Sequence, residues 1–134
     1  MNFNRINKSG KKFEDEVKSI LNESNHSYKS NKNKGIDYEI RFVDRLDGLE
    51  VKAQKTEGSV DEKLPHTLYK YSKKYNNIVF LFHDNFKLNP KIQEHMEFVA
   101  ELKEVNLVLL WGLKKFKNYL NGNLKDDKNI LNFC

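Results

Sequence analysis

The chain has 134 residues, which is the length of one domain built around one continuous hydrophobic core. Hydrophobic residues make up 38% of it, and no apolar run approaches the ~20 residues that a membrane-spanning helix needs. The N-terminus lacks the apolar segment of a signal peptide, and Cys134 is the single cysteine. We therefore expect a cytoplasmic protein with no membrane partner and no internal disulfide.

The charge balance favours a polyanionic partner. The formal net charge is +5, and 21 of the 24 basic residues are lysine. Asparagine is also abundant, and an AT-rich prokaryotic, phage or viral genome produces this joint excess without selection for nucleic-acid binding. Composition alone therefore leaves two alternatives open, a phosphate-binding face and a merely soluble surface.

The first predicted element is a helix from about Ser9 to Glu23. Apolar residues recur in it at helical spacing: Phe13, Val17, Ile20 and Leu21. The polar stretch that follows ends this helix and leaves room for one short edge strand around residues 27–30.

Two runs of period-two alternation come next, at 36–43 and 49–54, and together they predict a β-hairpin. The first run is expected to place four apolar residues on one face: Ile36, Tyr38, Ile40 and Phe42. The second run places three polar residues on one face: Glu50, Lys52 and Gln54.

The loop of this hairpin decides which polar residues meet. A loop over 43–48 puts Asp37 across from the neighbourhood of Lys52, with Glu50 one diagonal step away. A turn at Asp47-Gly48 would instead pair Asp37 near residue 58 and separate these groups.

The second half predicts helices that alternate with buried strands. We expect a helix from about Leu64 to Tyr75 with Pro65 in its first turn, and a third helix that opens at Asn89-Pro90. The other expected elements are strands at 77–82 and 105–111 and a short helix at 113–120. The tail, 122–134, is expected to add a strand or a subunit contact. This order predicts an α/β fold in which helices flank a mixed central sheet.

One motif resembles a known superfamily. "GID", twelve further residues and "EVKAQ" are similar to the PD-(D/E)xK nucleases, which include restriction enzymes, resolvases and phage nucleases. Asp37 matches the first acid of that pattern, and 50–52 matches its acid-x-Lys tripeptide. The pattern often has a proline where Ile36 stands here.

The resemblance implies a restriction endonuclease-like αβββαβ core over about 9–82, within a single nuclease-like domain that covers 1–134. A helix–strand–helix extension would follow at 89–121. The implied activity is Mg²⁺-dependent hydrolysis of DNA phosphodiester bonds, of restriction, homing, phage or resolvase type, with Mn²⁺ able to replace Mg²⁺.

The chemistry assigns a role to each motif residue. Asp37 and Glu50 would be the metal ligands, and the carbonyl oxygen of Val51 would add a neutral ligand. Lys52 would orient the attacking water or stabilise the developing charge, and Gln54 would position water or the scissile phosphate.

The first helix of this superfamily often contributes a glutamate. Glu14 and Glu16 lie about equally far from the apolar stripe, on opposite flanks, so periodicity does not choose between them. The family pattern favours Glu14. Both acids near a helix N-terminus would also complement the helix dipole without any catalytic role.

The resemblance and the basic charge also predict two kinds of partner, DNA and further copies of the chain. Four lysines surround the second helix and are candidates for contacts to the DNA backbone, or else form a solvated helix face: Lys63, Lys70, Lys73 and Lys74. Cleavage of two strands needs two metal sites, so we expect a homodimer or larger oligomer. The alternative function is a catalytically silent nucleic-acid-binding or assembly module on the same fold.

Overall fold

The computed structural model describes residues 2–31, 35–53, 63–122 and 130–131. These residues form four helices and one mixed sheet of six strands, so the chain has an α/β fold. The elements are α1 Asn2–Glu23, β1 Ser27–Ser30, β2 Tyr38–Arg41, β3 Leu46–Lys52, α2 Leu64–Tyr71, β4 Asn77–Phe82, α3 Pro90–Lys103, β5 Asn106–Trp111, α4 Leu113–Leu120 and β6 Ile130–Leu131.

The strands lie side by side in the order in which they occur in the chain, β1 to β6. The three central strands β3, β4 and β5 are parallel, and β1, β2 and β6 join antiparallel at the two sides. The carboxyl ends of β3 and β4 therefore open at the same end of the sheet.

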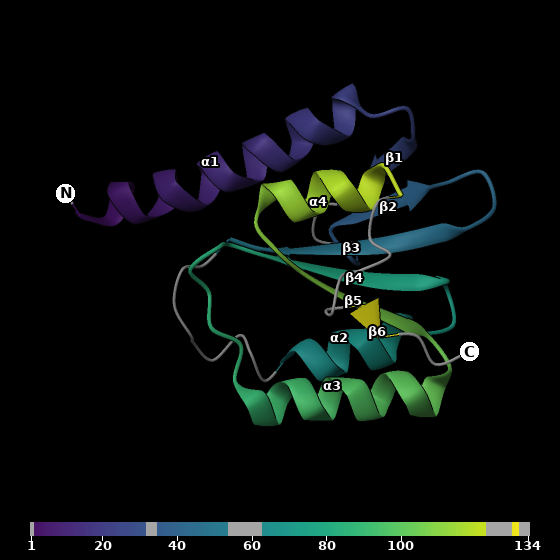
Figure 1. The fold of residues 1–134 in the computed structure, drawn as a ribbon. Coiled ribbons are helices and arrows are strands. Elements are labelled where there is room, and N and C mark those ends of the chain that lie inside the picture. Colours follow the sequence, from purple (N-terminus) through teal and green to yellow (C-terminus); the bar gives the residue numbers. More distant parts are fainter. Residues whose placement is uncertain (1, 32–34, 54–62, 123–129, 132–134) are drawn as a thin grey trace.

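The helices form a layer on each face of the sheet, with α1 and α4 on one face and α2 and α3 on the other (Figure 1). Strand β4 explains how both layers are held: Val79 and Leu81 point into the core under α1 and α4. Ile78, Phe80 and Phe82 point into the core under α2 and α3. A strand covered on both faces has no polar side, which accounts for the continuous apolar run "NIVFLF".

Most predicted elements are confirmed. The strand at 77–82 and the helix at 113–120 have the expected bounds, and the early edge strand is present as β1. Asn89 caps α3, because its side-chain oxygen accepts a hydrogen bond of 2.8 Å from the backbone N–H of Lys91. The tail contributes β6, which pairs with β5.

Two helix bounds differ from the prediction. The first helix begins at Asn2 rather than about Ser9, so its N-terminal half extends beyond the sheet (Figure 1). The second helix ends at Tyr71, and the chain turns before Tyr75. Tyr75 is nevertheless buried, because the turn carries it back onto the core.

The predicted loop of the hairpin is wrong. The backbone N–H of Phe42 donates to the carbonyl of Arg45 at 2.9 Å, which closes a tight turn, and residues 46–48 belong to β3. Tyr38 pairs with Leu49. Continuing this register by one step brings Asp37 opposite Glu50 rather than Lys52.

The face predicted for Ile36 is also wrong. Ile36 packs in the core under α2 and α3, whereas Tyr38, Ile40 and Phe42 lie at the core under α1 and α4. Gly35, with a φ of 149°, begins a bend over residues 35–37, and a bend interrupts the alternation on which the prediction relied.

Candidate active site

Asp37 and Glu50 are held together by hydrogen bonds to backbone at the start of β2 and the end of β3. The N–H of Asp37 donates to Oε1 of Glu50 at 3.1 Å. The N–H of Val51 donates to Oδ2 of Asp37 at 2.8 Å. Each bond ties one strand to the acid of the other, so the two carboxylates occupy a fixed position.

Lys52 completes this group from the same strand. Its Nζ lies 3.4 Å from Oε2 of Glu50, and both side chains are largely buried, at 18% and 14% exposure. The alternation of β3 directs Glu50 and Lys52 to one face, while Leu49 and Val51 pack in the core on the other. We call Asp37, Glu50 and Lys52 the acid–lysine cluster.

The electrostatics of Glu50 reflect this crowding. Burial raises the pKa of its carboxyl, and the neighbouring Asp37 raises this pKa further. Lys52 and the N–H of Asp37 act in the opposite direction, yet the pKa of Glu50 stays above its ordinary value. Two carboxylates held side by side, of which Glu50 is desolvated, favour the binding of a cation.

Glu14 is the acid of α1 that interacts with this cluster. Burial raises its pKa first, and Asp37 is the next cause. Tyr38 lies within the same field, since burial, then Glu14 and Asp37 raise the pKa of its phenol. The structure therefore brings Glu14 into the neighbourhood of Asp37.

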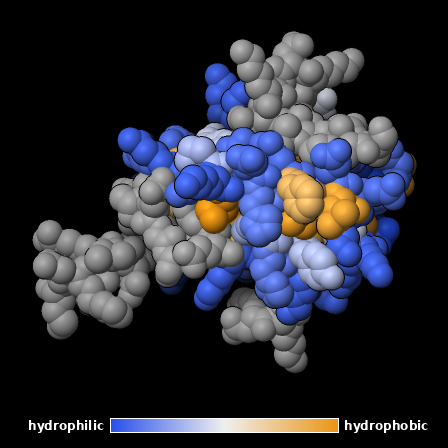
Figure 2. Space-filling model, turned by 90° about the horizontal axis from the view of Figure 1, so that it is seen from below, coloured by the Kyte–Doolittle hydropathy of each residue, from blue (hydrophilic) through white to orange (hydrophobic). Residues whose placement is uncertain are grey.

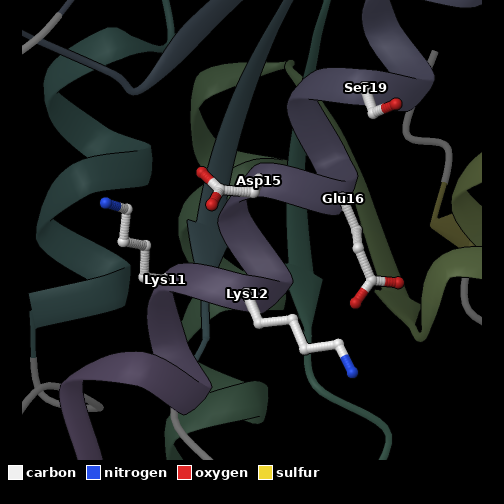
Figure 3. A pocket seen from close by; sticks show the side chains of 5 residues that line it. All are labelled: Lys11, Lys12, Asp15, Glu16 and Ser19. Atoms are coloured by element: carbon white, nitrogen blue, oxygen red, sulfur yellow. The ribbon is translucent and has the colours of Figure 1, made fainter. Parts of the chain in front are cut away.

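Glu16 lies elsewhere on α1. It lines a shallow surface hollow together with Lys11, Lys12, Asp15 and Ser19. Figure 3 shows Lys12 and Glu16 on one flank of the helix and Lys11 and Asp15 on the other. These are pairs four residues apart, the spacing at which opposite charges stabilise an exposed helix.

His83 adjoins the backbone of Lys52 from the neighbouring strand, at a position outside the motif. His83 directly follows β4, and its N–H donates to the carbonyl of Lys52 at 3.2 Å. Its ring packs against Phe13 of α1, with centroids 5.5 Å apart. Nδ1 accepts a hydrogen bond from the N–H of Asn85, so the neutral ring carries its proton on Nε2. The sequence indicates this position, because His83 directly follows a buried strand and functional sites lie at the carboxyl ends of parallel strands.

The donor set of the cluster fits Mg²⁺, which binds proteins through one or two carboxylates and keeps several waters. Asp37 and Glu50 supply the carboxylates. The carbonyl of Val51 points to the same neighbouring strand as its N–H, and therefore toward Asp37. Among the described residues, no group of three or more His, Cys, Asp or Glu side chains is arranged to hold a metal ion, so Glu14 does not complete a third ligand. Gln54 lies outside the described residues.

The four predicted DNA-contacting lysines have different surroundings. Lys74 forms an ion pair of 2.7 Å with Glu39 on β2. The ammonium of Lys70 lies 5.5 Å from the centre of the Tyr71 ring. Lys63 and Lys73 are exposed. Lys74 is therefore paired with Glu39 on β2 and not with the acid–lysine cluster.

In the described part of the chain, no helix has the length and apolar character that crossing a membrane requires. Comparisons of the chain with protein-family models, with curated proteins and with solved structures find no match.

Proposed function

We propose that this protein is a divalent-metal-dependent DNA endonuclease whose active site is the acid–lysine cluster. The observation that supports it best is the pair of adjoining carboxylates, Asp37 and Glu50, held by backbone N–H groups beside Lys52. An ion pair that only stabilises the fold needs one carboxylate and one lysine. Here a second carboxylate, Asp37, raises the pKa of Glu50, and two adjoining carboxylates are typical of a cation site. The order α1-β1-β2-β3-α2-β4 is also compatible with a restriction endonuclease-like αβββαβ core.

The residues divide the chemistry between them. A bound Mg²⁺ or Mn²⁺ would supply Lewis acidity and a water of lowered pKa. Asp37 and Glu50 would hold the ion, with the carbonyl of Val51 as a neutral donor. Lys52 places a positive charge beside these acids, where it would stabilise the charge that develops on the phosphate oxygens. Glu14 would orient the water from α1.

The proposed substrate is DNA. The net charge of +5 favours a polyanion, and the exposed Lys63 and Lys70 offer contacts to phosphates. Cutting both DNA strands uses two active sites. The arrangement of two copies of the site would therefore decide whether the cleavage is of restriction, homing, phage or resolvase type.

The test is cleavage of supercoiled plasmid, bulged DNA and four-way junction DNA in Mg²⁺. The wild-type chain should cut at least one of them. Lys52→Ala should cut roughly 100- to 1,000-fold more slowly, because it removes charge stabilisation in the transition state. Lys29→Ala, at an exposed position on β1, is the matched control and should cut at the wild-type rate. No cleavage of any substrate, or full activity of Lys52→Ala, would refute the proposal.

A second candidate function is a silent nucleic-acid-binding or assembly module. It is favoured by the basic charge balance of the chain and by Ile36, which stands where the motif often has a proline. Such a module should bind DNA in a salt-dependent manner that is indifferent to Mg²⁺ and to Asp37→Asn. A calorimetric titration separates the two functions: binding of Mn²⁺ to the wild-type chain that is lost in Asp37→Asn supports the enzyme.

A further inference from the structure

The outer surface of α2 and α3 carries large apolar side chains that the fold leaves uncovered. Tyr69, Phe98 and Leu102 are 54%, 61% and 62% exposed, although each lies on a helix packed against the sheet. Figure 2, which views this side of the molecule, shows hydrophobic side chains gathered within a mostly hydrophilic surface. We call Tyr69, Phe98 and Leu102 the outer patch.

The three side chains belong to one continuous area. Phe98 and Leu102 are four residues apart on α3 and therefore lie on the same face of that helix. The ammonium of Lys103, the next residue, lies 4.4 Å from the centre of the Tyr69 ring on α2. This contact places Tyr69 against the last turn of α3, which also carries Leu102. Exposed apolar areas that cross two elements are typical of interaction surfaces.

The charges around the outer patch differ between its two sides, apart from Lys91, which is exposed on the Phe98 face of α3 seven residues before Phe98. Glu94 and Glu101, four residues before and three after Phe98, share its face of α3 and are exposed. On the Tyr69 side the charges are basic, with Lys103 over the ring and Lys73 exposed four residues further along. The segment from Lys63 to Asn77 contains no acid.

This division makes the outer patch complementary to itself. A two-fold axis through the patch would stack the apolar side chains of the two copies on each other. The same rotation would bring Glu94 and Glu101 of each copy toward Lys73 and Lys103 of the other.

We propose that the outer patch is the homodimer interface of this protein and that its occupant is a second copy of the chain. The inference is independent of the endonuclease proposal. It places the contact on the outer helices rather than on the tail or the edge strands. It also assigns Lys73 to the dimer rather than to DNA.

Sedimentation equilibrium of the full chain without DNA or metal tests the proposal. The wild-type chain should form a species of twice 15.9 kDa at micromolar concentration. Phe98→Glu should raise the dimer dissociation constant more than ~30-fold, because a central aromatic residue is lost and a charge is buried in its place. Val43→Glu is the matched control: Val43 is fully exposed in the turn between β2 and β3, so this variant should dimerise like the wild type.

Exchanging the charges across the proposed interface gives a more specific test. The double variant Glu94→Lys, Glu101→Lys should be monomeric, and so should Lys73→Glu, Lys103→Glu, because each places like charges across the interface. An equimolar mixture of the two should recover the dimer, since each acidic surface then meets a basic one. A wild-type monomer up to ~100 µM, a Phe98→Glu variant that dimerises normally, or a mixture that stays monomeric would each overturn the proposal.

Discussion

At the scale of single residues, Asp37 has the widest influence on its surroundings. It accepts a hydrogen bond from the backbone of Val51. Burial is the largest cause of the raised pKa values of Glu50, Glu14 and the phenol of Tyr38, and the charge of Asp37 raises each of them further. Asp37 therefore couples electrostatically to titratable groups on three elements, α1, β2 and β3.

Removing that charge has a direct consequence for the neighbours. In Asp37→Asn the side-chain oxygen can still accept from Val51, so the structure should persist while the pKa values of Glu50 and Glu14 fall toward their ordinary value. Carboxyl ¹³C shifts followed against pH measure both. Asp44→Asn, at an exposed site in the β2–β3 turn, should leave both unchanged. An unaltered Glu50 titration in Asp37→Asn would show that the two acids are not coupled.

Glu39 gives a prediction for stability against pH. The ammonium of Lys74 and the hydroxyl of Tyr75 bind its carboxylate and lower its pKa from 4.5 to about 2. A lowered folded-state pKa stabilises the native state above the unfolded value, and this contribution disappears as the pH falls from about 4.5 to about 2.

Urea unfolding of the wild type and Glu39→Gln checks this directly. The wild type should be more stable at pH 6 by about 1 kcal/mol, a modest value because Lys74 is largely exposed and solvent screens the pair. The difference should shrink as the pH approaches 2. A difference of constant size over this range would contradict the assignment.

At the scale of elements, β3 is fixed at its amino end by a buried carboxylate. Asp47 is fully buried and accepts hydrogen bonds from Nε of Arg45 through both oxygens, at 3.1 and 3.0 Å. Asn77 donates to it from β4 at 3.0 Å, and the hydroxyl of Tyr119 donates from α4. One side chain therefore fastens two strands and a helix, and it sets the register that delivers Glu50 to Asp37.

Removing this carboxylate should be costly. Asp47→Ala leaves Arg45 and Tyr119 without their acceptor and should lower the free energy of unfolding by roughly 3 kcal/mol. Asp44→Ala, three residues earlier and exposed, should change it by less than about 0.5 kcal/mol. Equal effects of the two substitutions in a denaturant titration would remove Asp47 from this role.

Gly48 supports the same strand by having no side chain. A Cβ at this position would lie 2.8 Å from Cδ1 of Ile36 and 2.8 Å from Cδ2 of Tyr75. Gly48→Ala should therefore destabilise the fold by roughly 1–3 kcal/mol through overpacking. Thermal unfolding followed by circular dichroism measures the loss, and an unchanged midpoint would mean that Tyr75 moves aside at no cost.

Asp47 and Gly48 also illustrate which features of the fold could be predicted from the sequence and which could not. Local patterns correctly predicted α4, the continuous apolar strand β4 and the start of α3 at Asn89-Pro90, because each depends on residues that are close in sequence. Asp47-Gly48 looked like turn chemistry, yet its partners Asn77 and Tyr119 are distant in sequence. The spacing of Asp37 and Glu50 predicted that they meet, whereas their pairing depended on these long-range contacts.

At the scale of the whole molecule, the two proposals together predict a division of activities. If two copies join through the outer patch and each cuts one strand, Phe98→Glu should still nick supercoiled plasmid but should release far less linear product in a single binding event. Quantifying nicked and linear DNA on a gel over time measures this. Wild-type proportions of linear product from a monomeric variant would show that double-strand cleavage does not need the dimer.

The strand order of the sheet bears on how the chain is made. Because β1 to β6 lie in the sheet as they occur in the chain, each strand that leaves the ribosome can pair with the edge formed just before it. No earlier strand must wait for a later one to be inserted between its neighbours, so pairing proceeds in the direction of synthesis. The antiparallel pair β2–β3, closed by its tight turn, is complete well before β4 emerges. The free edge of β3 is then available for β4 to pair with.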